Sequence, residues 1–292
     1  MGSVNIILDT DIGPDCDDAG AVAVLHALSR LGEAHIVGMM HCTSSRWGAG
    51  CLDALNTYYG RSDIPVGTLK DQGFLDEERY ASYNRRIAVQ FPNRYRGEHL
   101  APDALGLYRQ LLTESEDASL VIAAIGPLRN LALLLREEPE LVARKVKTLV
   151  VMGGSFPAGR EWNFEMDPAS ARQVAAGWPT PILFAGYEVG CAILTGKRLL
   201  TDAPADHPVR QSYEAFGVGV AGRPSWDLIA VLLAVRGVPE EWRLSDPGTI
   251  EIAPDGTNRW LPGGGQHRYI TAVDAPEAME QLLEYWLVDM MG

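Results

Sequence analysis

The stretch ILDTDIGPDCDDAGAVAVL, residues 7–25, runs from a predicted buried strand into a predicted helix. It carries five aspartates within ten positions, namely Asp9, Asp11, Asp15, Asp17 and Asp18. Carboxylates this close repel one another unless water, a proton or a cation lies between them. A helix N-terminus explains Asp17 and Asp18, because its free N–H groups and its dipole favour acids. It does not explain Asp9 and Asp11, which end a buried strand.

The turn between the two groups of acids indicates how they come together. Gly13 and Pro14 are typical of a tight turn, which would fold Asp11 back toward Asp17 and Asp18. Oxygen donors around a turn suit a hard divalent cation, and calcium suits them better than magnesium when several protein oxygens bind together. A bound cation brings a water to a carboxylate and lowers the pKa of that water. The cluster therefore indicates a hydrolase.

Beyond this stretch, short apolar strands alternate with amphipathic helices. The predicted strands are 4–11, 34–42, 119–126, 146–154 and 181–189. The predicted helices are 18–31, 48–60, 127–140, 167–177 and 224–237. This alternation predicts an open α/β fold, with a mostly parallel sheet flanked by helices in a single domain over residues 1–292. The polar segment 71–99 has no clean period and is predicted to be a lid or mobile loop. Residues 241–266 are predicted to form irregular strands and turns.

The composition of the 292 residues narrows the function. Hydrophobic residues make up 47% and charged residues 22%, which indicates a well-buried core. The formal net charge of −13 disfavours nucleic acid and anionic membranes as partners, because both require clustered Lys and Arg. The four cysteines form no CxxC pair, so no zinc site is predicted. With neither a signal-peptide pattern nor an apolar stretch of membrane-spanning length, we predict a cytoplasmic protein with reduced cysteines.

The acidic stretch resembles the N-terminal fingerprint of the inosine–uridine-preferring nucleoside hydrolase family, D-x-D-P-G-x-D-D-A. Here the segment reads DTDIGPDCDDA, with two extra residues between its halves. Further blocks resemble family segments and keep the family's order: GRSDIPV (60–66), AAIGPLRNLALLL (123–135), VVMGGSF (150–156) followed by EWNFEMDPASA (161–171), and SWDLIAV (225–231). The resemblance implies the fold of that family and calcium-dependent hydrolysis of the N-glycosidic bond of a ribonucleoside, which releases free base and ribose.

The resemblance also implies a calcium site and a catalytic base. Asp11 would bind calcium and act as general base on the water that the metal holds. Asp18, Asp227 and the main-chain carbonyl of Ile125 would complete the ligands. Relatives of this family usually assemble as dimers or tetramers, so the resemblance implies a homodimer or homotetramer.

The substrate side of the resemblance is less complete. It implies that Asp17 and Asn163 hold ribose hydroxyls and that Glu161 lies toward the 5′ end. Trp226 stands where many purine-competent members have a His that protonates the leaving base. Indole is no acid, so Trp226 could stack on the base but could not protonate it.

Five further residues are weaker candidates for the site. Asp15 lies in the extra part of the fingerprint, Cys42 follows the second strand, and Arg160 stands near the expected 5′ side of the ribose. Asp15 also fits a solvated neighbour of the capping aspartates, and a buried thiol and a surface Arg are the more ordinary interpretations of Cys42 and Arg160. His41 and His99 are candidate acids for the leaving base, although each is also typical of a structural His.

Other interpretations remain open for individual residues and for the function. Glu161 and Asn163 also fit a helix entry before Asp167, and Asp227 fits the first turn of a helix. The alternative functions are hydrolysis of a modified nucleoside or another riboside, and weakly catalytic binding of a nucleoside or sugar on the same scaffold. Asp11 favours an enzyme, because binding alone needs no base.

Overall fold

The computed structural model describes residues 2–96, 100–288 and 290 of the chain. The eight strands of its main sheet are β1 (Val4–Thr10), β2 (Ala34–His41), β3 (Val66–Thr68), β4 (Leu120–Ala124), β5 (Val146–Met152), β7 (Ile182–Ala185), β10 (Arg243–Leu244) and β13 (Arg268–Ala272). Their spatial order is β10-β13-β7-β5-β4-β1-β2-β3. All neighbouring strands are parallel except β10 and β13. The predicted mostly parallel α/β sheet is therefore confirmed.

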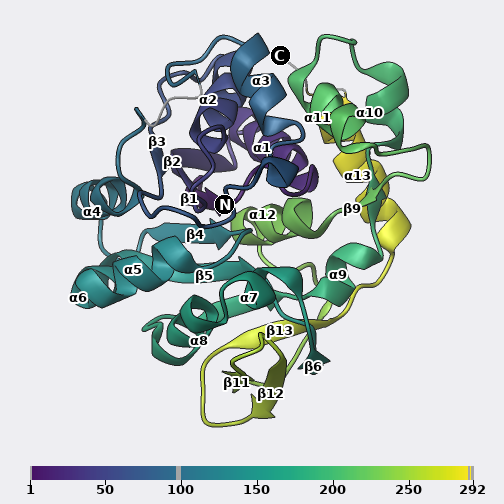
Figure 1. Cartoon of the computed structure of the whole chain (residues 1–292). Helices are drawn as coiled ribbons and strands as arrows, with labels where there is room; N and C mark the ends of the chain where they lie inside the picture. The colour runs from purple at the N-terminus through teal and green to yellow at the C-terminus, as the bar shows by residue number, and fades with distance from the viewer. Residues whose placement is uncertain (1, 97–99, 289, 291–292) are drawn as a thin grey trace.

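The helices lie on both faces of this sheet (Figure 1). They are α1 (Asp17–Arg30), α2 (Gly48–Tyr58), the 3₁₀ helix η1 (Glu78–Tyr80), α3 (Asn84–Gln90), α4 (Ala104–Glu114), α5 (Arg129–Glu137), α6 (Pro139–Lys145), α7 (Trp162–Met166), α8 (Pro168–Gly177), α9 (Tyr187–Cys191), α10 (Lys197–Asp202), α11 (Pro208–Phe216), α12 (Trp226–Arg236) and α13 (Pro276–Val288).

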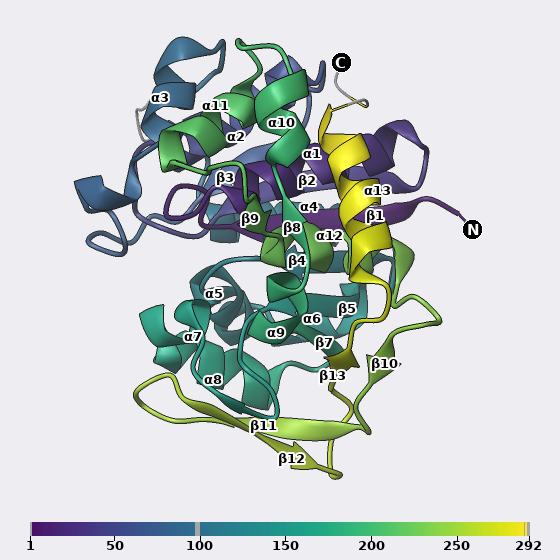
Figure 2. The ribbon, with the colours of Figure 1, turned by 90° about the vertical axis from the view of Figure 1, so that its right-hand side faces the viewer.

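The described residues also form two small antiparallel sheets. One contains β6 (Ala158–Gly159), β11 (Gly248–Ile252) and β12 (Asn258–Pro262), and the other contains β8 (Leu194–Thr195) and β9 (Arg223–Pro224). The three-stranded sheet packs against α8 at one end of the molecule (Figure 2). The irregular strands predicted over 241–266 correspond to β10, β11 and β12.

Each face of the main sheet has its own apolar core, because successive residues of a strand point to opposite faces. In β1, Ile6 and Leu8 belong to the core that includes α1, α2 and α12, whereas Ile7 belongs to the core that includes α4, α5 and α8. All three side chains are fully buried. A strand covered on both faces needs an unbroken apolar run, and that run is what the sequence provides before Asp9.

Two predicted elements are wrong in detail. The helix predicted over 127–140 is divided into α5 and α6, because Pro139 disfavours helical dihedrals at Glu138, which has φ −135° and ψ 47°. The strand predicted over 181–189 ends at Ala185, and α9 begins two residues later. Its apolar run is too short to distinguish a strand from a helix by pattern.

The segment 71–99 contains more regular structure than its sequence indicates. It holds η1 and α3, and Tyr83, Asn84 and Ile87 are buried against the rest of the molecule. Residues 97–99, with His99, lie outside the described residues. A lid role for this segment stays a prediction.

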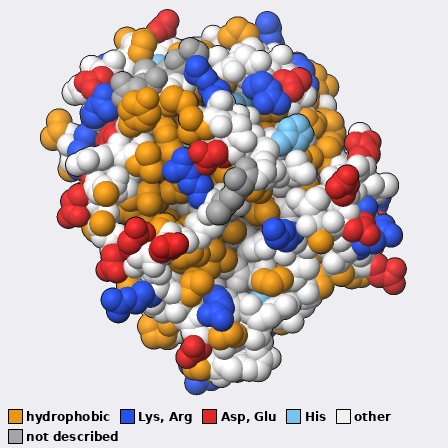
Figure 3. Space-filling model, turned by 180° about the vertical axis from the view of Figure 1, so that it is seen from behind, with side chains coloured by type: hydrophobic (Ala, Val, Ile, Leu, Met, Phe, Trp, Pro, Cys, Tyr) orange, Lys and Arg blue, Asp and Glu red, His pale blue; other side chains and the backbone are white. Residues whose placement is uncertain are grey.

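Surface charges are dispersed rather than gathered on the face seen in Figure 3, where Lys and Arg side chains alternate with Asp and Glu side chains. Many of the described surface charges are paired, as in the fork between Arg61 and Asp63. Within the described part of the chain, no helix has both the length and the apolar composition to cross a membrane.

Candidate active site

A cavity of about 540 Å³ opens where four parallel strands of the main sheet end. It is lined by residues at or just beyond the carboxyl ends of β1, β4, β5 and β7, the position where open α/β sheets bind ligands. The lining residues are Asp11, Pro14, Asp15, Asp17, Asp18, Tyr80, Ile125, Met152, Arg160, Glu161, Trp162, Asn163, Glu165, Tyr187, Phe216, Arg223, Trp226 and Asp227.

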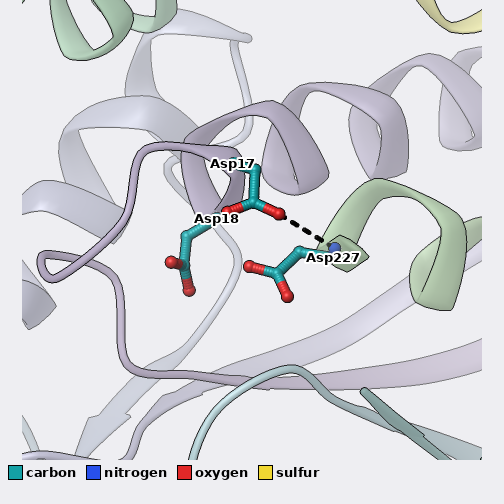
Figure 4. A group of neighbouring side chains, drawn as sticks. All are labelled: Asp17, Asp18 and Asp227. Atoms are coloured by element: carbon teal, nitrogen blue, oxygen red, sulfur yellow. Dashed lines mark hydrogen bonds between the residues drawn. The ribbon is translucent and has the colours of Figure 1, made fainter. Parts of the chain in front are cut away.

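Four buried aspartates form what we call the carboxylate floor: Asp11, Asp17, Asp18 and Asp227. Figure 4 shows Asp17 and Asp18 at the start of α1 and Asp227 in the first turn of α12, with their carboxylates directed toward one another. One oxygen from each of these three lies within 4.8 Å of the others. The Asp17 carboxylate accepts a hydrogen bond from the backbone N–H of Asp227 at 3.1 Å, which joins the starts of the two helices.

Asp11 lies beside this group of three rather than within it. Its Oδ1 packs so closely against Gly126 that a Cβ there would lie 2.7 Å from it, so the glycine is needed for this approach. Burial, followed by the charges of Asp15, Glu161 and Asp9, raises the pKa of Asp11 to about 8. Ile125, whose main-chain carbonyl is the other predicted calcium ligand nearby, also lines the cavity. Its backbone N–H donates to the Asp9 carbonyl at 2.8 Å.

Ionisation of the other three floor aspartates is also unfavourable when no cation is bound beside them. Burial first, and neighbouring carboxylates second, raise the pKa values of Asp17, Asp18 and Asp227 well above their ordinary range. The hydroxyl of Thr10 donates to Asp18 Oδ1, which offsets a part of this cost. A set of buried, oxygen-only donors that repel one another matches what a hard cation requires.

The loop that carries the first acids is held from outside by the segment 71–99. Asn84 Nδ2 donates to the Ile12 carbonyl at 2.9 Å, and the Tyr83 hydroxyl donates to the Asp15 carbonyl at 2.6 Å. Gly13 permits this contact, since a Cβ there would lie 2.3 Å from Asn84 Nδ2. In this structure the segment therefore supports the floor from behind.

Asp9 and Cys42 do not line the cavity. Asp9 Oδ2 accepts hydrogen bonds from the Tyr108 hydroxyl at 2.8 Å and from Asn130 Nδ2 at 3.1 Å. Burial raises the pKa of Asp9 to about 7 and raises the pKa of the Cys42 thiol. Both residues are therefore buried outside the cavity, Asp9 in β1 two residues before Asp11 and Cys42 directly after β2. His41 is also buried, and its two ring nitrogens lie 3.0 Å from the hydroxyls of Thr68 and Thr43.

Glu161 and Asn163 form the wall of the cavity across from α1 and α12. Glu161 caps α7, since its carboxylate accepts from the backbone N–H groups of Gly154, Asn163 and Phe164 at 2.9, 2.7 and 3.3 Å. Burial nevertheless raises its pKa to about 7. Asn163 Nδ2 donates to the Met152 carbonyl at 3.2 Å. The capping interpretation of Glu161 is thus correct, and the same residue also lines the cavity.

The side of the cavity beside α12 is what we call the aromatic wall: Tyr187, Phe216, Arg223 and Trp226. The rings of Tyr187 and Trp226 stack with centroids 5.5 Å apart, and Trp226 Nε1 donates to the Tyr187 carbonyl at 2.8 Å. Arg223 lies 5.1 Å from the Trp226 ring and forms an ion pair with Asp15. Of these four residues, only Trp226 belongs to a motif visible in the sequence.

Three more residues line the cavity away from the floor and the aromatic wall: Arg160, Tyr80 and Trp162. Arg160 lines the cavity but pairs with Glu165 at 2.7 Å, and its side chain is 58% exposed. Tyr80, which no motif indicates, and Trp162, which lies in the block EWNFEMDPASA but has no predicted role, lie edge to face at 6.3 Å in another part of the cavity. Tyr80 has no fixed spacing from the acidic stretch, so sequence reasoning offers no signal for it.

Comparisons with known proteins agree with this arrangement. A sequence model of the inosine-uridine preferring nucleoside hydrolase family matches residues 6–274. The non-specific ribonucleoside hydrolase RihC of Salmonella paratyphi A is 30% identical over 213 residues, which cover 70% of this chain and 67% of that protein.

Two solved structures share the fold. A purine-preferring ribonucleoside hydrolase from Gardnerella vaginalis superposes with a TM-score of 0.77 at 18% identity, over 97% of this chain and 98% of that one. A plant nucleoside hydrolase, PpNRh1, superposes with a TM-score of 0.76 at 20% identity, over 98% of this chain and 99% of that one.

Proposed function

The chain belongs to the inosine-uridine preferring nucleoside hydrolase family, and we propose that it hydrolyses a ribonucleoside to free base and ribose in a calcium-dependent reaction with Asp11 as the base. The observation that carries this proposal is the carboxylate floor, in which buried acids from β1, α1 and α12 converge on one cavity. A protein that only bound a nucleoside would not need so many mutually repelling carboxylates beside its ligand.

We propose that Asp11, Asp18, Asp227 and the main-chain carbonyl of Ile125 hold the cation. Asp17 lies within the same group of oxygens as Asp18 and Asp227, so its ribose contact would be made beside the metal. The donor set fits calcium, because that ion accepts many protein oxygens in flexible geometry. When bound, the ion supplies positive charge that offsets the repulsion of the acids and helps to orient water and ribose hydroxyls.

The proton transfer falls to Asp11. Its buried carboxylate lines the cavity, and a cation bound beside it would keep the group ionised and able to take a proton from the attacking water. As the water oxygen bonds to C1′, the bond from C1′ to the base nitrogen breaks and the sugar gains positive charge. The neighbouring carboxylates of the floor stabilise that charge.

The ribose would be held between the floor and the opposite wall. Asp17 and Asn163 would bind its hydroxyls, and Glu161 would lie toward its 5′ end. Three backbone N–H groups already fix Glu161, so it would be positioned before the substrate arrives, which lowers the entropic cost of binding. Trp226 would lie beside the leaving base.

The test is base release from a panel of purine, pyrimidine and modified ribonucleosides, assayed with EDTA and then with added calcium. Turnover that calcium restores would support the proposal and name the base. Bound nucleoside without release from any member would contradict it and favour a binding protein. A homodimer or homotetramer and a cytoplasmic location stay predictions; light scattering after size exclusion would measure the assembly.

A further inference from the structure

The aromatic wall holds a cation in a fixed place. Arg223 precedes α12 and packs against two rings, with Cζ 5.0 Å from the Phe216 centroid and 5.1 Å from the Trp226 centroid. Trp226 is itself fixed by Tyr187 and by Gly190, where a Cβ would lie 2.4 Å from the indole. The guanidinium therefore lies on a rigid surface at the edge of the cavity that it helps to line.

Asp15 orients this guanidinium. Arg223 Nε donates to Asp15 Oδ1 at 3.1 Å and Nη2 donates to Oδ2, which together make a fork. Asp15 is fixed in turn, because its Oδ1 also accepts the Cys16 N–H at 2.6 Å and its carbonyl accepts the Tyr83 hydroxyl. Asp15 lies within the two-residue extension of the acidic stretch. The remaining nitrogen, Nη1, has no hydrogen-bond partner among the described residues.

Cleavage of the N-glycosidic bond requires that the leaving base be stabilised, and no His among the described lining residues can do so. When the C1′–N bond breaks, its electron pair stays on the base, and an unstabilised base anion is a poor leaving group. The described lining contains no His and no Lys, and its cations are Arg160 and Arg223. Arg160 is paired with Glu165 and its side chain is 58% exposed, whereas Arg223 lies beside Trp226, where the leaving base is expected.

We propose that Arg223 stabilises the leaving base by donating a hydrogen bond from its guanidinium, and that Asp15 is the residue that positions it. The inference rests on the proposed hydrolysis. The water oxygen bonds to C1′ and gives a proton to Asp11, while the electron pair of the broken bond passes to the base. The base leaves as an anion beside Arg223 and then takes a proton from solvent, and Asp11 returns its proton to solvent.

This role has a chemical consequence for the substrate. A guanidinium only donates hydrogen bonds, so it selects a base with an acceptor, a ring nitrogen or a carbonyl oxygen, at the reachable edge. It also helps in proportion to the charge that develops on the leaving group. A riboside whose leaving group is already a weak base, such as p-nitrophenolate, needs little help.

The experiment compares wild type with Arg223→Gln on inosine, uridine and p-nitrophenyl riboside, in calcium. The loss of one preorganised donor predicts a roughly 100-fold lower kcat on the nucleosides. On the aryl riboside we expect less than about a threefold change, which also reports an intact metal and ribose site. Arg61→Gln is the matched control, because Arg61 forms the same fork with Asp63 outside the cavity at 2.9 Å and 2.9 Å, and it should change neither rate.

The positioning role of Asp15 has its own readout. Asp15→Asn should lower nucleoside turnover about tenfold and spare the aryl riboside, and adding it to Arg223→Gln should cost nothing further, because coupled residues are not additive. Equal losses on both substrate classes, or full nucleoside turnover by Arg223→Gln, would overturn the inference alone. Wild type that cleaves neither class would overturn the proposed function together with it.

Discussion

The carboxylate floor and the aromatic wall of the same cavity differ in how deeply they are buried. The floor residues are 2–5% exposed and come from a strand end and two helix starts packed in the core. On the wall, Tyr187 is 47% exposed and the Arg223 side chain is 30% exposed. The proposed base and metal ligands therefore lie in the buried core, whereas the proposed contacts to the leaving base lie at the edge of the cavity, where substitutions cost the core little.

The largest expected effect is at the floor. Asp11→Asn keeps the shape of the side chain but removes the base, so kcat should fall by about 10³-fold. In the metal-free protein the same change should raise the melting temperature, because it removes one of several buried carboxylates that repel one another. Base release measures the change in kcat, and thermal unfolding measures the change in melting temperature.

Asp63→Asn is the control for that variant, since Asp63 is an exposed aspartate outside the cavity. Activity of Asp11→Asn at the wild-type level would contradict the assignment of the base and place the chemistry elsewhere in the cavity.

Removal of the metal should have an effect of comparable size. EDTA should abolish turnover, and calcium at about 100 times its Kd should restore it and stabilise the fold by roughly 2.7 kcal/mol. Magnesium should restore less, because it demands a tighter, more regular shell of ligands. Elemental analysis would check that the protein is free of metal. Full turnover by such protein would contradict this prediction.

The wall should respond more weakly and more selectively. Trp226→Ala removes the stack on Tyr187 and the surface under Arg223, so kcat/KM for nucleosides should fall about tenfold, or roughly 1.4 kcal/mol. Calcium affinity, measured by titration calorimetry, should not change. Loss of calcium binding in this variant would show that floor and wall are not separable.

The smallest effect on turnover is expected behind the floor. Asn84→Ala leaves the Ile12 carbonyl without its partner, which should cost about 1–3 kcal/mol of unfolding free energy and reduce calcium affinity. Asn93→Ala is the matched control, because Asn93 Nδ2 bonds the Ala88 carbonyl at 2.7 Å within its own segment. It should leave calcium affinity intact, and equal effects of both variants would show that α3 does not support the floor.

The parts of this protein that local sequence encodes were predictable. The apolar run before Asp9 predicts a strand buried on both faces, and the acids after Gly13 predict a helix start. The ordered blocks that resemble a family indicated Asp18 and Asp227 as neighbours, although 209 positions separate them in the chain. Local pattern failed at Pro139, whose effect on the preceding residue divides a predicted helix, and over 181–189, where the strand ends at Ala185 and a helix follows.

The sequence by itself determined the strand and helix order and the acids at the strand ends, because periodicity and turn chemistry act over a few residues. Only the tertiary structure decided that Arg223 pairs with Asp15, 208 positions away, and that Asn84 holds the Ile12 carbonyl. Such pairings depend on which surfaces pack together, and no local spacing encodes them. For the same reason, the floor could be anticipated from its motif, while the wall, apart from Trp226, became visible only in the folded chain.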